Sequence, residues 1–197
     1  MNYNASYDVL ALLHHLSSSV DGADEAELHV FSYLACLLSV YAGHPASDWG
    51  YDFIASPAGA PFAVELDDAV RWAANVGFVA SAGARWQLTP EGTAEFRALS
   101  ELSTHYRRLQ FIEPACASTL SIPLGWVRRG INQTPALQSA GRRDSRRYLS
   151  DEAAIDALYD QFDVLKRVIR QDVGDLLVPA VVWLEYLAST TLEGNPS

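Results

Sequence analysis

The most restrictive pattern in this chain is a succession of helix, hairpin and helix in its first half. Apolar residues recur at helical spacing through Phe62–Gly77, which predicts an amphipathic helix. Phe78–Ala80 and Arg85–Thr89, separated by a turn of small residues, predict two strands of a tight hairpin. Thr89 followed by Pro90 is typical of a helix N-cap with proline at the first helical position. Another helix is therefore expected directly after the hairpin.

Two further helices are expected before this succession. Apolar spacing predicts one over Tyr7–Leu16. The next begins near Asp24, an N-cap candidate with Glu27 three residues later, and extends to Tyr41. Its apolar residues surround the helix axis, which indicates burial at the centre of a domain or against a partner. Three helices followed by a two-stranded wing are the order of a winged helix-turn-helix, so a mainly α protein with such a unit over residues 1–103 is predicted.

The apolar spacing of residues 104–197 predicts a second, helical unit that packs on the first. Ser150 is the N-cap candidate of an amphipathic helix whose apolar stripe ends at Ile169. The last helix, around Asp175–Thr190, is apolar except for Glu185. Its apolar stretch is too short to span a bilayer, so we expect it to be buried in the fold or in a dimer. A homo-oligomer is predicted on this basis.

Length and composition favour a folded cytoplasmic protein. A chain of 197 residues with 49% hydrophobic content can bury one core or two small coupled ones. No window is long and apolar enough for a membrane span, and the opening MNYNASYDVL lacks the features of a signal peptide. Cys36 and Cys116 lie far apart among apolar or small residues, which predicts reduced, buried thiols rather than a disulfide or a zinc site.

Charge is distributed unevenly along the chain. The net charge is −10, yet residues 1–70 contain ten acidic residues and no Lys or Arg. Residues 97–147 hold nine arginines against three acidic residues. This asymmetry predicts an acidic lobe and an arginine-bearing lobe, each with its own class of partner.

Four short segments carry a family resemblance: Tyr51–Ile54, Gly59–Phe62, Val76–Val79 and Gln87–Gly92. Together they resemble the winged-helix segments of Panacea-type domains and the middle components of bacterial ABC-ATPase three-component defence systems. The resemblance covers roughly residues 25–100. It implies a non-enzymatic role as an antitoxin-like regulator or an assembly subunit, with an ABC-type ATPase subunit as the implied partner.

The helix before the hairpin carries carboxylates on its outward face. Glu65, Asp67 and Asp68 accompany Arg71 there, and carboxylates oppose the approach of a recognition helix to DNA phosphates. We therefore expect this helix to bind protein rather than to read the major groove, with Glu65, Asp68 and Trp72 as candidate contacts. The alternative is a solvated face on which Asp67 pairs with Arg71 at i,i+4 spacing.

Arginine pairs recur in the second half, and guanidinium clusters suit phosphates or carboxylate-rich surfaces. They predict a contact site for a nucleic-acid backbone or an acidic protein partner. The alternative is a solvated face paired with Asp144, Asp151 and Glu152. The candidate contacts are Arg128, Arg129, Arg142, Arg143, Arg146 and Arg147.

Patterns of catalytic sites are absent from the sequence. It has no Gly-x-Ser-x-Gly elbow, no phosphate-binding glycine loop and no dinucleotide fingerprint. His44, Asp48 and Asp52 have metal-ligand spacing, but Gly43, Pro45 and Gly50 interrupt the helix that would align them. No enzyme activity, cofactor or metal is predicted, and a loop metal site at His44 and Asp48 stands as a third interpretation.

These patterns predict a non-catalytic winged-helix adaptor or regulatory subunit of a bacterial, defence-type assembly. Its contacts would lie on the winged helix or on the apolar last helix. The alternative is a DNA-binding transcriptional regulator or antitoxin that contacts phosphates through Arg128–Arg147.

Overall fold

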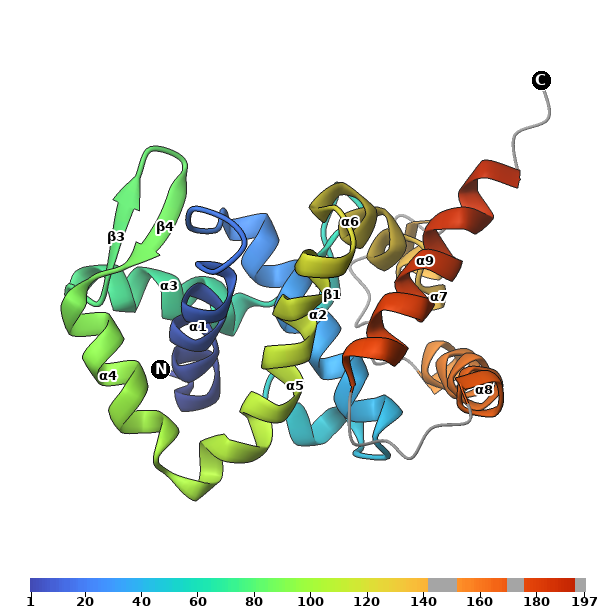
Figure 1. Ribbon diagram of the computed structural model, residues 1–197, viewed down its shortest axis with the longest axis horizontal. Coiled ribbons are helices and arrows are strands. Elements are labelled where there is room, and N and C mark those ends of the chain that lie inside the picture. The colour runs from blue at the N-terminus through green and yellow to red at the C-terminus, as the bar shows by residue number, and fades with distance from the viewer. Residues whose placement is uncertain (142–151, 170–175, 194–197) are drawn as a thin grey trace.

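A computed structural model describes residues 1–141, 152–169 and 176–193, which are mainly helical (Figure 1). Two small antiparallel sheets, β1–β2 and β3–β4, complete the described residues. The helices are α1 (Tyr3–Leu16), α2 (Glu25–Tyr41), α3 (Val64–Asn75), α4 (Pro90–Ser100), α5 (Ser103–Ser121), α6 (Leu124–Asn132), α7 (Pro135–Gly141), α8 (Glu152–Ile169) and α9 (Leu177–Glu193). The short elements are the 3-10 helix η1 (Ala46–Trp49) and the strands β1 (Ile54–Ala55), β2 (Pro61–Phe62), β3 (Val79–Ala82) and β4 (Arg85–Leu88).

Helices α1 and α2 form the centre of the core. Helix α1 begins earlier than predicted because the side chain of Asn2 accepts a hydrogen bond from the Ala5 N–H at 3.1 Å and caps the helix there. The predicted capping box of α2 is confirmed, with Asp24 and Glu27 each accepting from the other's backbone N–H. Fifteen of the seventeen residues of α2 are buried, and α5 packs directly against it. The apolar circumference of α2 is therefore covered within this chain.

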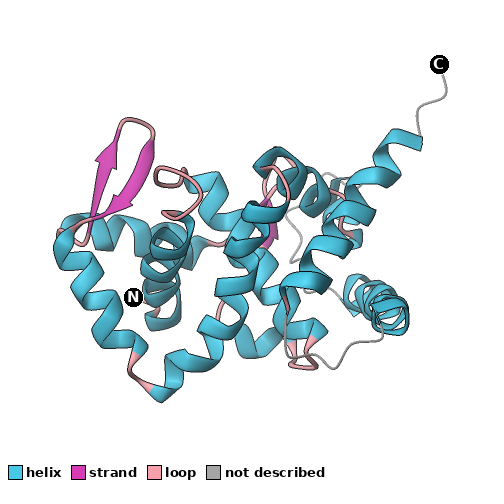
Figure 2. Ribbon diagram, in the orientation of Figure 1, coloured by secondary structure: helices cyan, strands magenta, loops and turns pink. Residues whose placement is uncertain are grey.

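The predicted helix, hairpin and helix are found as α3, β3–β4 and α4 (Figure 2). Helix α3 begins at Val64 rather than Phe62, because Phe62 pairs with Ile54 in the β1–β2 sheet, which the sequence did not predict. Strand β4 also pairs with Ala23 through a single bridge to Trp86. Thr89 caps α4 by accepting from the Gly92 N–H at 3.0 Å, as predicted.

One continuous core joins the two predicted units. A single cluster of buried apolar residues extends from Ala5 on α1 to Leu187 on α9. Helix α5 supports this continuity, since it packs against α1, α2 and α9. The β3–β4 hairpin and α8 lie at opposite ends of the molecule's longest axis (Figure 1). Within the described residues, no helix combines the length and hydropathy needed to cross a membrane.

Candidate functional site

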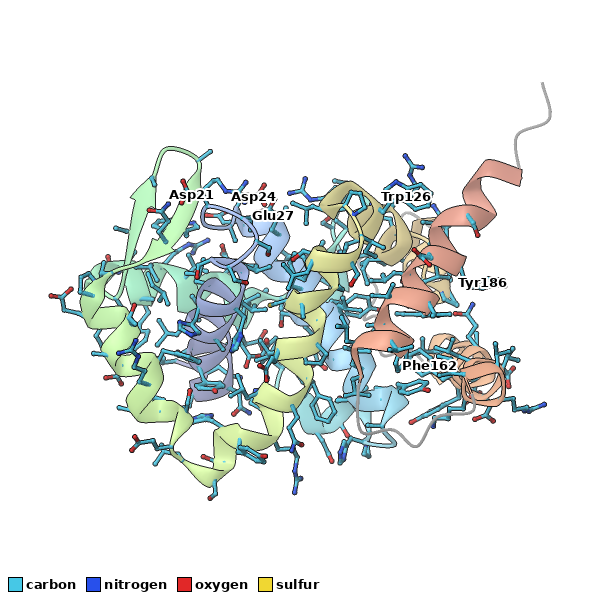
Figure 3. All side chains as sticks on the ribbon, viewed as in Figure 1. Asp21, Asp24, Glu27, Trp126, Phe162 and Tyr186 are labelled. Atoms are coloured by element: carbon cyan, nitrogen blue, oxygen red, sulfur yellow. The ribbon has the colours of Figure 1, made fainter. Side chains whose placement is uncertain are left out.

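An apolar groove lies between α8 and α9, with a volume of about 450 Å³. The two helices meet where the rings of Phe162 and Trp183 pack edge to face, 5.1 Å apart, and where Trp183 Nε1 donates to Gln161 Oε1 at 3.2 Å. Figure 3 labels Phe162 on α8 and Tyr186 on α9. The groove is lined by Asp160, Gln161, Val164, Leu165, Val168, Val182, Trp183 and Tyr186.

On α8, the groove is lined by Leu165 of the buried stripe and by two apolar residues outside that stripe. Leu158, Phe162 and Leu165 point into the core, as the predicted stripe requires. Val164 and Val168, four residues apart, are 57% and 70% exposed instead. Two solvent-exposed valines on one helical turn enlarge the apolar face beyond what the described residues cover.

On α9, one side of the helix is buried within the fold, and the predicted burial of the other side in a dimer stays a prediction. Trp183 and Leu184 are buried. Val178, Val182 and Tyr186, spaced four residues apart, form an exposed stripe in which Tyr186 is 58% exposed. The sequence signal for this stripe was the apolar circumference of the helix.

The predicted protein contacts on α3 have different surroundings. Trp72 is half-buried, with its ring edge-on to Phe78 at 5.7 Å. Glu65 is half-buried and Asp68 is exposed. Arg71 pairs with both Asp67 and Asp68, so the guanidinium on this helix is already neutralised by its own neighbours. The solvated-face interpretation of Asp67 and Arg71 therefore matches the geometry.

Arg128 is held by carboxylates at the start of α2. Its Nη2 donates to Asp24 Oδ2 and to Glu27 Oε1, each at 2.9 Å. Arg85 of the hairpin donates to the other oxygen of Glu27 at 2.7 Å, so Glu27 receives two guanidinium groups while only 2% exposed. Figure 3 shows Asp24 and Glu27 beside the hairpin. Arg128 thus links α6 to the start of α2. Its Nη2 is hydrogen-bonded to two carboxylates and is not turned toward a phosphate.

Of the other predicted arginines, the described residues include Arg129. Arg129 is exposed, with its guanidinium carbon 5.6 Å from the centre of the Trp126 ring. The other four, Arg142, Arg143, Arg146 and Arg147, lie outside the described residues. The predicted arginine contact site stays a prediction.

His44 and Asp48 line a small cavity of about 60 Å³ together with Arg107 and Arg108. Two guanidinium groups at such a cavity disfavour a metal cation electrostatically. In the described part of the chain, no group of three or more His, Cys, Asp or Glu residues could hold a metal ion. Asp52, the third residue of the predicted loop site, does not line this cavity.

The predicted buried thiols are confirmed. Cys36 and Cys116 are both free and buried. Burial raises the pKa of the Cys36 thiol to about 12 and raises that of Cys116 as well. Because the thiolate is the nucleophilic form, neither cysteine has the chemistry of a reactive thiol near neutral pH.

No family model, curated protein or solved structure matches this chain. The resemblance to Panacea-type domains and to three-component defence systems stays a prediction from the four short segments.

Proposed function

We propose that this protein is a non-catalytic adaptor or regulatory subunit that assembles with another protein through the α8–α9 groove. The observation that carries the proposal is the open apolar groove itself. Val164, Val168 and Tyr186 are each more than half exposed although they belong to one contiguous lining. Exposed contiguous apolar patches on folded chains mark interaction surfaces more often than isolated apolar residues do.

The shape of the groove favours a helical segment over a small molecule. A small ligand is usually buried over most of its surface, whereas the exposed lining of this groove leaves one side open to solvent. An amphipathic helix fills such a channel with residues at i, i+4 and i+7, and its polar face remains in water.

In this proposal the first half of the chain is a winged-helix scaffold. Support comes from the order of α1, the Ala23 bridge, α2, α3 and the β3–β4 hairpin, which follows the winged-helix succession. Residues 42–63 separate α2 from α3, where a DNA-reading helix-turn-helix has a turn of three or four residues. With carboxylates on α3, this scaffold is better suited to protein contact than to DNA. Membership of a bacterial defence-type assembly, with an ABC-type ATPase subunit as partner, is proposed from the sequence resemblance.

The proposal is tested with a photo-crosslinking amino acid in place of Tyr186, used in the full chain and in cells that express it naturally. We expect one discrete protein adduct, which then forms a complex with this chain when both are purified. The same amino acid in place of Tyr106, which is 62% exposed on α5, is the matched control. In a second control, Val182→Asp should abolish the adduct at position 186 because it places a charge in the groove.

Two outcomes contradict the proposal. One is an equally strong adduct from position 106. The other is an adduct at position 186 that persists unchanged in the Val182→Asp protein, because the contact would then not use the groove.

A further inference from the structure

The groove has an acidic border. Asp160 lines it directly, and Asp156 and Asp163 lie on the same side of α8, four residues before and three residues after. All three carboxylates are exposed, and none forms an ion pair with another described residue. On the other wall, Glu185 is exposed next to Tyr186.

Positive charge near this border is sparse among the described residues. Lys166 places its ammonium 5.1 Å from the centre of the Tyr41 ring, so its charge is directed toward the core side of α8 rather than the groove. Arg167 is exposed and lies one turn beyond Asp163. Among the described residues, the Arg167 guanidinium is therefore the one positive group on this side of α8, against the carboxylates of Asp156, Asp160 and Asp163.

We infer that the groove binds a cationic amphipathic helix of a partner protein. This inference rests on the proposed function and names the chemistry of the partner. The apolar stripe of the ligand helix would cover Val164, Val168, Val182 and Tyr186, while Lys or Arg residues beside that stripe face the acidic border. Complementary charge at the edge of an apolar contact selects the partner and speeds its association.

The geometry sets the length of the ligand's apolar stripe. From Asp160 to Val168 the groove lining on α8 covers eight residue steps, which corresponds to about 12 Å along a helix. The ligand therefore needs apolar residues over at least two helical turns. Two turns are also the spacing of the usual i, i+4 and i+7 anchors.

A second copy of this chain is a poorer occupant on the same grounds. It would bring an identical acidic border, and each chain carries a net charge of −10. If two α8 helices pair antiparallel, Arg167 of each can face Asp160 of the other, but the described part of α8 offers no second basic residue on that face for Asp156 and Asp163. Like charges close together at an interface oppose association.

The test uses two synthetic peptides of about 20 residues, long enough to form helix in water. Both have the same leucine stripe, and one has lysine where the other has glutamate on the flanks. Binding to the full chain is measured by fluorescence anisotropy. We expect the lysine peptide to bind at least about tenfold more tightly than its glutamate twin at low salt, with the difference shrinking as salt rises.

Two sets of variants assign the effect to the groove. Val182→Asp should abolish binding of the lysine peptide. The triple variant Asp156→Asn, Asp160→Asn and Asp163→Asn should weaken binding by about tenfold at low salt. Its matched control changes three exposed carboxylates elsewhere, Asp52→Asn, Glu91→Gln and Glu101→Gln, and should leave binding unchanged although the net charge changes equally.

Each contrary result overturns the inference in a recognisable way. Equal binding of the two peptides, or no binding of the lysine peptide, means that the partner is not a cationic helix. A dimer of this chain that Val182→Asp dissociates, seen by sedimentation, identifies a second copy as the occupant.

The photo-adduct at position 186 separates this inference from the proposed function. If the lysine peptide is present during irradiation and does not prevent the adduct, the adaptor role stands and the partner is not a cationic helix. Loss of both the adduct and peptide binding removes both proposals.

Discussion

Arg108 of α5 binds Asp8 of α1 in the interior of the protein, with Nε donating to Oδ1 at 2.8 Å and Nη2 donating to Oδ2 at 2.5 Å. The remaining Nη1 donates to the Trp49 carbonyl, and the Tyr51 hydroxyl donates to Asp8. Burial opposes the charged form of Arg108, but contact with Asp8 outweighs burial and raises the Arg108 pKa. The pair is buried, so it joins the two halves of the chain through a charged contact that is shielded from water.

We expect Asp8→Asn to lower the free energy of unfolding by about 4 kcal/mol, because the Arg108 guanidinium loses its compensating charge while buried. Equilibrium urea unfolding measures the loss. Asp68→Asn, which removes an exposed partner of Arg71, is the control and should change stability by less than about 0.5 kcal/mol. Similar values for the two variants would mean that the buried pair contributes no more than a surface pair.

Glu27→Gln should destabilise the protein by about 2 kcal/mol, since it removes the charge that Arg85 and Arg128 share. The loss is smaller than for Asp8 because both arginines are partly exposed and can be hydrated. Glu25→Gln, an exposed change in the first turn of the same helix, should cost under about 1 kcal/mol. Thermal unfolding of both variants measures the two losses of stability. Equal losses for Glu25→Gln and Glu27→Gln would contradict this expectation.

Gly92→Ala is expected to destabilise the chain by about 3 kcal/mol, because a Cβ at position 92 would lie 1.9 Å from the Phe78 carbonyl oxygen. Gly125→Ala is the matched change in another helix, where a Cβ meets nothing within 4 Å. That substitution should be neutral or stabilise by up to about 1 kcal/mol. Urea unfolding of the two variants tests the close approach of α4 to the Phe78 carbonyl. Equal changes in stability for Gly92→Ala and Gly125→Ala would contradict that close approach.

Stability should fall as the pH drops below neutrality, in part through His29. Burial lowers the pKa of His29 from 6.5 to about 4, and its Nδ1 accepts a hydrogen bond from the Ala63 N–H at 3.2 Å. The unfolded chain therefore binds a proton at higher pH than the folded one, so this contribution is complete above pH 6.5 and is lost as the pH falls toward 4.

By about pH 5 the loss from His29 alone should reach about 2 kcal/mol. Urea unfolding of the natural protein and of His29→Gln across this range isolates the contribution, since Gln does not titrate. An NMR titration of the His29 ring gives its folded pKa directly. A measured pKa near 6.5 would contradict the assignment.

The chain should not form a complex with duplex DNA that survives physiological salt. Arg128 is engaged by carboxylates, and α3 presents carboxylates to its surroundings. Light scattering after size exclusion, with and without a short duplex, measures this. A salt-sensitive complex that disappears when Arg142, Arg143, Arg146 and Arg147 are changed to Ala would support the DNA-binding alternative instead.

Local signals predicted most of the helices, because capping and apolar spacing act over a few residues. Asp24 with Glu27 and Thr89 with Pro90 marked the starts of α2 and α4 correctly. Sequence could not show that Glu27 is buried between two arginines, since Arg85 and Arg128 lie 58 and 101 residues away along the chain. From sequence alone, Arg128 is therefore a candidate ligand contact.

The groove was beyond sequence reasoning for a related reason. The apolar circumference of α9 indicated burial on all sides, but the angle at which α8 meets α9 determines which side is covered. Phe162 and Trp183 fix that contact, and neither residue identifies the other in the sequence. Val164 and Val168 lie outside the α8 stripe and gave no signal of their own until the two helices were placed together.

The continuity of the core from α1 to α9 has a consequence for hydrogen exchange. A chain with one core tends to open globally, so a ligand that binds the folded state alone stabilises every amide whose exchange requires that opening. A helix bound in the α8–α9 groove should therefore slow exchange in the most protected amides of α1 and α2, which do not line the groove. Slower amide exchange in α1 and α2 would therefore detect ligand binding without a probe attached in the groove.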